Sequence, residues 1–333
     1  MNNKNIALTG IRPTSRLHIG NYLGAVKGML DLQNTNEFET YYMVADLHAL
    51  TTPFNKATLQ KSVKDVVIDY LACGLNPEKS TIFIQSTNPE HANLANLLSS
   101  VINVSKMLHL PTYKEKIKEN PNNITMALLN YPVLMAADIL AYKANYVPVG
   151  KDQEAHMEIA RETARKLNSI YKTSFPEPKT YSTEGKYIPS LTGVGKMSKS
   201  IENSCIYLSD SLEIIKNKIA KIPTDSGKGE SLPLEGGVNT LLTLVAHFIS
   251  NSEKEKIEKD YLSSGIRYGD IKNTLSEKIF EFLQPIQQKR QEIENKNTYV
   301  KEVLEHGRIK ATLKAKETTD EVKDCFGINY TNI

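Results

Sequence analysis

The sequence has few cysteines, no tryptophan and no long apolar run. Its three cysteines, Cys73, Cys205 and Cys325, lie far apart and form no Cys-x-x-Cys pair, which argues against a disulfide framework and a thiolate zinc site. No apolar stretch approaches the roughly 18 residues that a membrane-spanning helix needs. The absence of tryptophan accompanies a composition biased toward Lys, Asn and Ile, and it excludes no function.

Charge of one sign is also lacking, because the net charge is only +3 over 333 residues. This argues against general coating of a polyanion but permits a local basic surface. With 40% hydrophobic and 24% charged residues, the composition is that of a globular protein of about two domains. The N-terminal residues lead into an expected strand without the apolar core of a signal peptide, so we expect a cytoplasmic protein.

Strand patterns alternate with helical patterns in the first half of the chain. The predicted strands cover residues 6–8, 41–45, 81–84 and 146–149. The predicted helices cover residues 20–32 and 59–73, and a further helix follows Gly150. Such alternation predicts βαβ units, and therefore an α/β fold with a Rossmann-like parallel sheet that binds ligands beyond the carboxyl ends of its strands.

After about residue 210 the strand patterns end. Helical spacing predicts helices over residues 211–222, 238–250, 253–263, 270–295 and 299–315, with a break near Pro285. The chain is therefore predicted to have an α/β domain over residues 1–190, a linker over 191–210, and an all-α domain with C-terminal helices over 211–333.

Two short motifs are candidates for chemistry. The run KMSKS, residues 196–200, follows a glycine-rich stretch, and two lysines on such a loop suit polyphosphate charge that develops during a reaction. Alone, this run is more often a solvated turn. The segment LHIGN, residues 17–21, precedes a predicted helix, whose start could bind phosphate or ribose.

Asp138 is the one carboxylate in the apolar run 131–142. Pro132 suits the first position of a helix, and no Lys or Arg lies within four positions of Asp138. We therefore expect a buried carboxylate without a local partner, which either pairs with a distant basic group or awaits a donor on a ligand.

Other polar residues follow predicted strands. Asp152 follows the fourth strand, where it either caps the next helix or accepts from ribose hydroxyls. Asp46 and His48 follow the second strand, and for His48 a satisfied core histidine is the simpler interpretation.

Together these segments resemble the tryptophanyl-tRNA synthetases, a branch of the class I aminoacyl-tRNA synthetase family, along the whole chain. The segments that carry the resemblance are GIRPT (10–14), HIGNYLG (18–24), DLHA (46–49), YP (131–132) with MAADIL (135–140), VPVGKDQ (147–153) and KMSKS (196–200). The first and last motifs of the class, HIGH and KMSKS, are shared widely, whereas the segments around residues 135–140 and 147–153 are specific to the tryptophan branch.

The resemblance implies a tryptophan–tRNA ligase with a Rossmann catalytic domain and a helical anticodon-binding domain. Such an enzyme activates L-tryptophan with Mg-ATP to tryptophanyl-adenylate and pyrophosphate, and then transfers tryptophan to the 3′ end of tRNA(Trp). It also implies a homodimer, no interaction with membranes, and Mg²⁺ bound through the ATP phosphates rather than by a metal site on the protein.

Residue roles carried over by position are expectations of the same kind. The catalytic residues would be Lys196, Lys199 and His18. The ATP contacts would be Arg12, Pro13, Thr14, Gly20, Asn21, Gly150, Lys151, Asp152, Ile188, Lys196, Met197, Ser198, Lys199 and Ser200. The tryptophan contacts would be Asp138, Leu8, His48, Tyr131, Met135, Val147, Val149 and Gln153.

Two positions depart from the family pattern. Arg12 stands where many relatives have Gln, and Lys151 where many have an acid, so both add positive charge near the phosphates. Three other interpretations remain open at this point: a tyrosyl-tRNA synthetase, a catalytically silent tRNA-binding paralogue and a small-metabolite adenylyltransferase. The amino acid that stimulates ATP–pyrophosphate exchange would discriminate among them.

Overall fold

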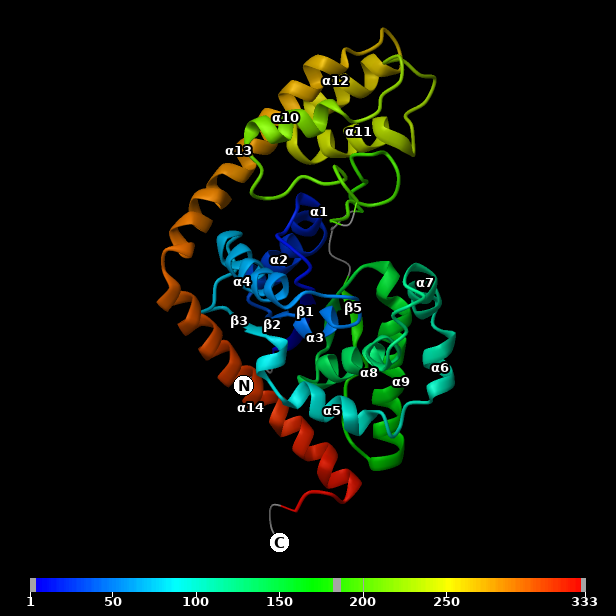
Figure 1. Cartoon of the computed structure of the whole chain (residues 1–333), viewed down its shortest axis with the longest axis vertical. Helices are drawn as coiled ribbons and strands as arrows, with labels where there is room; N and C mark the ends of the chain where they lie inside the picture. The colour runs from blue at the N-terminus through cyan, green and yellow to red at the C-terminus, as the bar shows by residue number, and fades with distance from the viewer. Residues whose placement is uncertain (1–3, 182–186, 200, 331–333) are drawn as a thin grey trace. The chain divides into compact units, whose positions relative to one another are not determined.

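The computed structural model describes residues 4–181, 187–199 and 201–330, apart from the side chain of Lys151. The chain forms two compact units (Figure 1). The first, here called the sheet unit, comprises Met1–Thr14, Gly28–Thr183 and Lys296–Ile333. The second, the helical unit, comprises Ser15–Lys27 and Glu184–Asn295.

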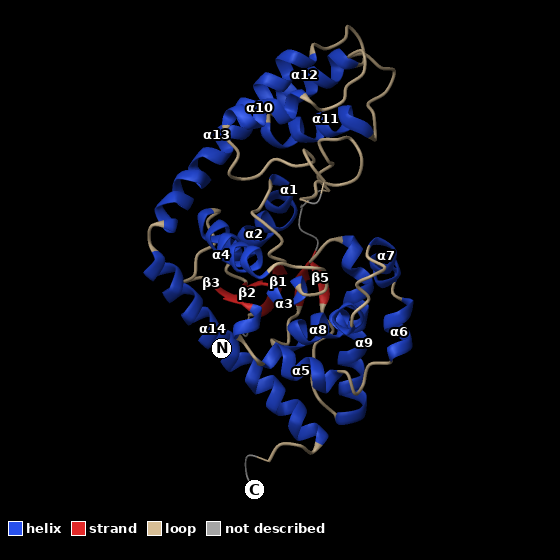
Figure 2. Ribbon diagram, in the orientation of Figure 1, coloured by secondary structure: helices blue, strands red, loops and turns tan. Residues whose placement is uncertain are grey.

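The sheet unit contains five parallel strands in the order β3-β2-β1-β4-β5 (Figure 2). The strands are β1 (Asn5–Ile11), β2 (Phe38–Val44), β3 (Ser80–Ile84), β4 (Tyr146–Pro148) and β5 (Lys179–Tyr181). The predicted α/β fold with a parallel sheet is therefore confirmed. Strand β5 was not predicted, because its three residues are exposed or only half-buried and carry no apolar run.

Side-chain hydroxyls join the ends of the central strands. The Tyr70 hydroxyl accepts from the Ile11 backbone N–H at 3.1 Å and donates to the Met43 carbonyl at 3.2 Å. The Thr9 hydroxyl donates to the Pro148 carbonyl at 2.8 Å, which ties β1 to β4. These bonds satisfy backbone groups just where the strands end and fix the edge from which the following loops depart.

The helices of the sheet unit include those that frame the candidate site. They are α2 (Lys27–Thr35), α3 (Asp46–Ala49), α4 (Lys56–Ala72), α5 (Glu90–Leu98), α6 (Val104–His109), α7 (Pro111–Glu119), α8 (Met126–Ala141), α9 (Glu154–Tyr171) and α14 (Asn297–Phe326), with the short 3-10 helices η2 (Gln85–Thr87) and η3 (Lys151–Gln153). Most of β2 is buried, as expected for a parallel strand whose two faces are both covered.

Helix α8 begins earlier than its sequence suggested. The Thr125 side chain caps the helix by accepting from the Leu128 backbone N–H at 3.3 Å. Pro132 consequently lies inside the helix, and the expectation that it occupies the first helical position is wrong. The cap supplied by Thr125 determines where the helix starts. The helix tolerates the loss of one backbone hydrogen bond at Pro132, which has no N–H.

Helix α14 packs on strand β3 and on helices α5 and α8 (Figure 1). At Gly307 the contact is so close that an added Cβ would lie 1.8 Å from the Ile82 carbonyl oxygen. The C-terminal helix therefore groups with the sheet, whereas the sequence pattern predicts one all-α domain over residues 211–333.

The helical unit contains α1 (Ile19–Asn21), the π-helix η1 (Tyr22–Val26), α10 (Leu212–Ala220), α11 (Gly236–Phe248), α12 (Asn251–Tyr261) and α13 (Tyr268–Glu294). Helix α13 continues through Pro285, so the predicted break is wrong. The Phe282 ring, one turn earlier, packs at 5.0 Å from Tyr22 and 5.4 Å from Phe248, measured between ring centroids, and these contacts hold the helix just before the proline. After the proline, Ile286 and Ile293 are buried. Among the described residues no helix is long and apolar enough to cross a bilayer.

Candidate functional site

Polar side chains gather at the carboxyl ends of β2 and β3. Asp46 and His48 lie in α3 directly after β2, and Gln85 opens η2 directly after β3. The Asp46 carboxylate accepts from the Ser86 backbone N–H at 2.9 Å, while the Gln85 side-chain oxygen accepts from the Leu47 N–H at 3.1 Å. These bonds hold the two loops together at the edge where parallel sheets bind ligands.

Asp138 lies at the centre of this group, in α8, and is fully buried. His48 Nε2 lies 2.8 Å from Oδ2, and His91 Nδ1 lies 2.6 Å from Oδ1. The Gln85 amide donates to both carboxylate oxygens, at 2.8 and 2.9 Å. Behind His91, the Tyr142 hydroxyl lies 2.8 Å from Nε2. Asp138 therefore receives four hydrogen bonds, about as many as a carboxylate accepts.

This arrangement decides between the two alternatives left open for Asp138 in favour of distant partners within the chain. Asp138 does not lack a partner within the chain, because its donors come from α3, η2 and α5, between 47 and 90 residues away in sequence. Burial disfavours its ionised form, but hydrogen bonds and charge from His48 and His91 outweigh this and hold the pKa of Asp138 well below its usual range. The expectation of a satisfied, buried His48 is confirmed.

Apolar side chains predicted to shape a pocket belong to the same hydrophobic cluster. Leu8 of β1 and Val147 of β4 are buried in it, and Met135, Val149 and Tyr131 pack against it while remaining half-buried. Met135 precedes Asp138 by almost one helical turn. The structure thus brings these predicted tryptophan contacts into one cluster within the sheet unit.

A second polar group surrounds the end of β4. The Tyr131 hydroxyl lies 2.6 Å from His156 Nε2, and the other ring nitrogen, Nδ1, lies 3.2 Å from Gln153 Oε1. The Gln153 amide nitrogen donates to Asp152 Oδ2 at 3.0 Å. Two predicted tryptophan contacts, Tyr131 and Gln153, are therefore linked through a histidine.

Predicted ATP contacts follow strands β1 and β4. Gly150 leaves room for the Asp152 carboxylate, since a Cβ at Gly150 would lie 2.5 Å from Asp152 Oδ1. Arg12 and Thr14, beyond β1, are exposed, and Pro13 between them is buried. The backbone of Lys151 opens η3, and its side chain lies outside the described part of the chain.

In the helical unit, His18 forms the N-cap of α1. Its Nδ1 accepts from the Asn21 backbone N–H at 3.3 Å, and the Asn21 side chain accepts from the His18 N–H at 3.2 Å. Burial and the nearby Lys199 ammonium lower the pKa of His18 to about 4. His18 is therefore a neutral imidazole near pH 7, with its proton on Nε2.

The run 196–199 lies against the same segment. A Cβ on Gly20 would approach the Met197 side chain at 3.2 Å, and the Lys199 ammonium donates to the Ser15 carbonyl at 2.8 Å. Met197 is buried, and its backbone N–H donates to the carbonyl of Ile188 at 3.1 Å. The structure thus brings the two motifs together, and the run is not a solvated turn. Ser200 lies outside the described residues.

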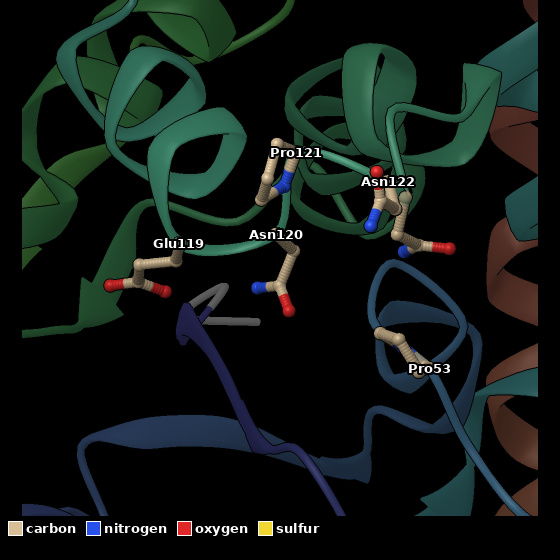
Figure 3. Close-up of a pocket in the computed structure, with 6 residues that line it drawn as sticks. Pro53, Glu119, Asn120, Pro121 and Asn122 are labelled. Atoms are coloured by element: carbon tan, nitrogen blue, oxygen red, sulfur yellow. The ribbon is translucent and has the colours of Figure 1, made fainter.

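Figure 3 shows a separate pocket of about 310 Å³ in the sheet unit. It is lined by Pro53, Glu119, Asn120, Pro121, Asn122 and Asn123. No predicted site residue lines this pocket, and we assign it no role.

The sequence relationships agree with this geometry. A family model described as "tRNA synthetases class I (W and Y)" matches residues 1–284. W and Y are the one-letter codes of tryptophan and tyrosine. The chain belongs to this family. The segments that meet around His18 and Met197 therefore carry the two class I motifs. The predicted family is confirmed.

Individual class I relatives span nearly the whole chain. The tryptophan–tRNA ligase of Chlamydia caviae is 39% identical and covers 99% of this chain and 97% of its own length. The tryptophanyl-tRNA synthetase structure from Mycoplasma pneumoniae has a TM-score of 0.86 at 32% identity, covering 99% of this chain and 100% of that one. The Campylobacter jejuni enzyme, complexed with ADP and tryptophan, has a TM-score of 0.84 at 31% identity, covering 97% and 99%.

Four polar residues were missed in the sequence: Gln85, His91 and His156 of these groups, and Thr112 of α7, whose hydroxyl lies 2.9 Å from His156 Nε2. Gln85 could have been found, because it directly follows a predicted strand. His156 lies three residues after Gln153, a spacing that places two side chains on one helical face. His91 and Thr112 carry no local signal, since only the folded chain brings them to their partners.

Proposed function

We propose that this class I synthetase is a tryptophan–tRNA ligase. In the first step a carboxylate oxygen of L-tryptophan bonds to the α-phosphorus of ATP while the bond to pyrophosphate breaks. In the second, the tryptophanyl group passes from the adenylate to the 3′ end of tRNA(Trp), and AMP leaves. The observation that carries the proposal is similarity over nearly the whole chain to tryptophan enzymes, one of them solved with ADP and tryptophan.

The proposed tryptophan site is the cluster around Asp138, with the indole N–H donating to its carboxylate. Because the carboxylate already receives four hydrogen bonds, the incoming N–H takes the place of one existing donor. His48 is the candidate to yield, since 11% of its side chain is exposed, whereas His91 and Gln85 are fully buried. Leu8 and Val147, with Met135 and Val149, are proposed as the apolar walls.

The proposed ATP contacts keep the predicted assignment. In the sheet unit they are Arg12, Pro13, Thr14, Gly150, Lys151 and Asp152. In the helical unit they are Gly20, Asn21, Ile188 and the run 196–200. We place Mg²⁺ on the ATP phosphates, where this ion usually binds. Among the described residues no group of three or more His, Cys, Asp or Glu side chains could hold a metal ion.

No side chain needs to act as a covalent nucleophile in this reaction, because tryptophan supplies the attacking carboxylate. The enzyme accelerates adenylate formation by aligning the tryptophan carboxylate with the α-phosphorus of ATP and by placing positive charge beside the departing pyrophosphate. Lys196 and Lys199 are proposed to supply that charge. His18 is neutral and offers Nε2–H as a donor.

The helical unit is proposed to bind the anticodon region of tRNA through α10–α13. Replacement of exposed lysines there, such as Lys221 and Lys256, by glutamate should raise the KM for tRNA and leave tryptophan-dependent exchange unchanged. We also propose a cytoplasmic homodimer. Light scattering should then give twice the chain mass of 37.3 kDa.

Aminoacylation tests the overall assignment. With ATP, purified protein and total tRNA, we expect tryptophan to be attached to tRNA(Trp), and tyrosine to be attached to no tRNA. Attachment of tyrosine would favour a tyrosyl-tRNA synthetase, and attachment of no amino acid would favour a silent paralogue.

A further inference from the structure

His156 is a buried histidine of α9 that no motif singles out. Only 1% of it is exposed. One ring nitrogen, Nδ1, lies 3.2 Å from Gln153 Oε1, and the other, Nε2, lies 2.6 Å from the Tyr131 hydroxyl and 2.9 Å from the Thr112 hydroxyl. The imidazole thus bridges η3 with α8 and α7. Both nitrogens of this buried ring are therefore paired with side chains, as a buried imidazole requires, and the ring couples three elements.

We call the hydrogen-bonded residues Thr112, Tyr131, His156, Gln153 and Asp152 the relay. The proton positions on His156 follow from its partners in the relay. The Asp152 carboxylate can only accept, so the Gln153 amide nitrogen faces it and the amide oxygen faces His156. Nδ1 of His156 must then carry a proton. Burial lowers the pKa of His156, so near neutral pH its Nε2 is unprotonated and accepts from a hydroxyl.

This arrangement fixes what Tyr131 offers to a ligand. Its one hydroxyl proton is used inside the relay, because Thr112 Oγ1 lies 2.8 Å away and His156 Nε2 lies 2.6 Å away. The lone pairs of Tyr131 remain available as acceptors. Gln153 Oε1 likewise uses one lone pair on His156 and keeps the second.

We propose that His156 is a positioning residue that keeps Tyr131 and Gln153 as acceptors for the α-ammonium group of the amino-acid substrate. The inference rests on the proposed function, which places tryptophan beside these two residues. An ammonium group has donors and no acceptor, so it binds only where neighbouring groups present lone pairs. His156 does not touch the substrate and acts through the orientation of its two partners.

The relay also gives substrate binding a defined pH dependence. A second proton on His156 turns Nε2 into a donor, so the Tyr131 hydroxyl must accept from it and direct its own proton elsewhere. The imidazolium charge then also opposes the ammonium group. The KM for tryptophan should therefore rise at acid pH, below the ordinary titration range of histidine. Among the described side chains, the charged or titratable groups that face the relay from neighbouring elements are His48, Asp152, Arg12 and Glu115.

Two conservative variants separate the arms of the relay. The amide nitrogen of His156→Asn stands near the position of Nδ1 and keeps the donor to Gln153. The amide of His156→Gln reaches the position of Nε2 and keeps the acceptor for Tyr131. Neither can gain the second proton, and His156→Leu removes both arms.

The experiment measures ATP–pyrophosphate exchange against tryptophan concentration between pH 5 and pH 8. We expect His156→Leu to raise the KM for tryptophan roughly tenfold or more, with kcat and the KM for ATP little changed, because Tyr131 and Gln153, both half-buried, each lose a bond. Asn and Gln should raise it less, and both should abolish the acid rise. The exposed His109 of α6 gives the control His109→Gln, expected to behave as wild type.

The outcomes are distinguishable. An acid rise in KM that persists in both the Asn and Gln variants would overturn the inference, as would normal KM values in all three. A fall in kcat without a change in KM would show that His156 serves another step. If His156→Leu does not fold, the pH dependence of the KM for tryptophan in His156→Asn and His156→Gln still tests the inference. Wild-type protein without tryptophan-dependent exchange would overturn the proposed function itself.

Discussion

His91 Nδ1 lies 2.6 Å from Asp138 Oδ1, and neither side chain is exposed to solvent. Tyr142 holds the opposite ring nitrogen of His91 at 2.8 Å, and Asn88 in turn donates to the Tyr142 hydroxyl at 3.1 Å. The carboxylate proposed to bind indole is therefore held from behind by a buried chain of hydrogen bonds. Its position and ionised state exist before any ligand arrives, which favours discrimination by hydrogen bonding over discrimination by ring size alone.

Asp138→Asn tests this discrimination. The new amide group presents a donor to His48, Gln85 or His91, which are donors themselves, and it cannot offer the ligand an ionised acceptor. We expect the KM for tryptophan to rise strongly and the preference for tryptophan over phenylalanine, on the order of 10⁴, to narrow. The KM for ATP should barely change. The ratio of kcat/KM values for the two amino acids is the measurement, and an unchanged ratio would mean that Asp138 is purely structural.

Lys196→Ala and Lys199→Ala test the proposed charge at pyrophosphate. Each should slow single-turnover formation of the adenylate about a hundredfold, or roughly 3 kcal/mol, because the charge develops mainly in the transition state. The affinity for tryptophan, measured by calorimetry, should stay near normal. Lys256→Ala, at an exposed position of α12, is the matched control. Near-normal activation by both variants would leave the run with a structural role only.

The lowered pKa of His18 predicts that the fold loses part of its stability at acid pH. Its folded pKa of about 4 lies below the ordinary value of 6.5, so as the pH falls below 6.5 the unfolded chain binds a proton before the folded chain does. Folding should weaken progressively down to about pH 4, by about 3 kcal/mol in all. His18→Asn keeps a helix-capping acceptor and should flatten this part of the pH profile of urea unfolding. An equally steep pH profile in His18→Asn would contradict the assignment of this acid sensitivity to His18. The control His109→Asn should have the same pH profile of unfolding as wild type.

Gly307→Ala tests the packing of α14 on the sheet. The added methyl group would meet the Ile82 carbonyl at 1.8 Å, so the helix must shift. We expect a loss of about 1–3 kcal/mol in the free energy of unfolding. Gly269→Ala in α13 is the control, because its Cβ would meet no atom within 4 Å. A loss as large at Gly269 would show that general helix effects, rather than the close contact, are responsible.

Much of the fold could be predicted from sequence because local patterns specify it. Four of the five strands and the helices after residue 210 follow from apolar spacing. The errors have physical causes: β5 is three residues long, and Pro132 and Pro285 lie inside helices whose caps or packing outweigh one missing hydrogen bond. The position of α14 depends on a close contact at Gly307 that no spacing rule detects.

The candidate site was predictable only in part, for the same reason. Asp138 was recognisable as an isolated carboxylate in an apolar helix, but its donors lie on three other elements. The sequence therefore leaves open whether this carboxylate is paired within the chain, and the fold pairs it with His48, Gln85 and His91. The His156 relay needs residues from α7, α8, η3 and α9, and only the pair Gln153 and His156 is close in sequence.

The most direct test of the central claim is ATP–pyrophosphate exchange by the purified protein with each of the twenty amino acids in turn. Tryptophan should stimulate exchange and tyrosine should give no more than a trace. Phenylalanine should be rejected by about 10⁴ in kcat/KM, because it would displace the His48 donor from Asp138 without supplying a donor of its own. Stimulation by tyrosine instead of tryptophan, or by no amino acid, would contradict the account.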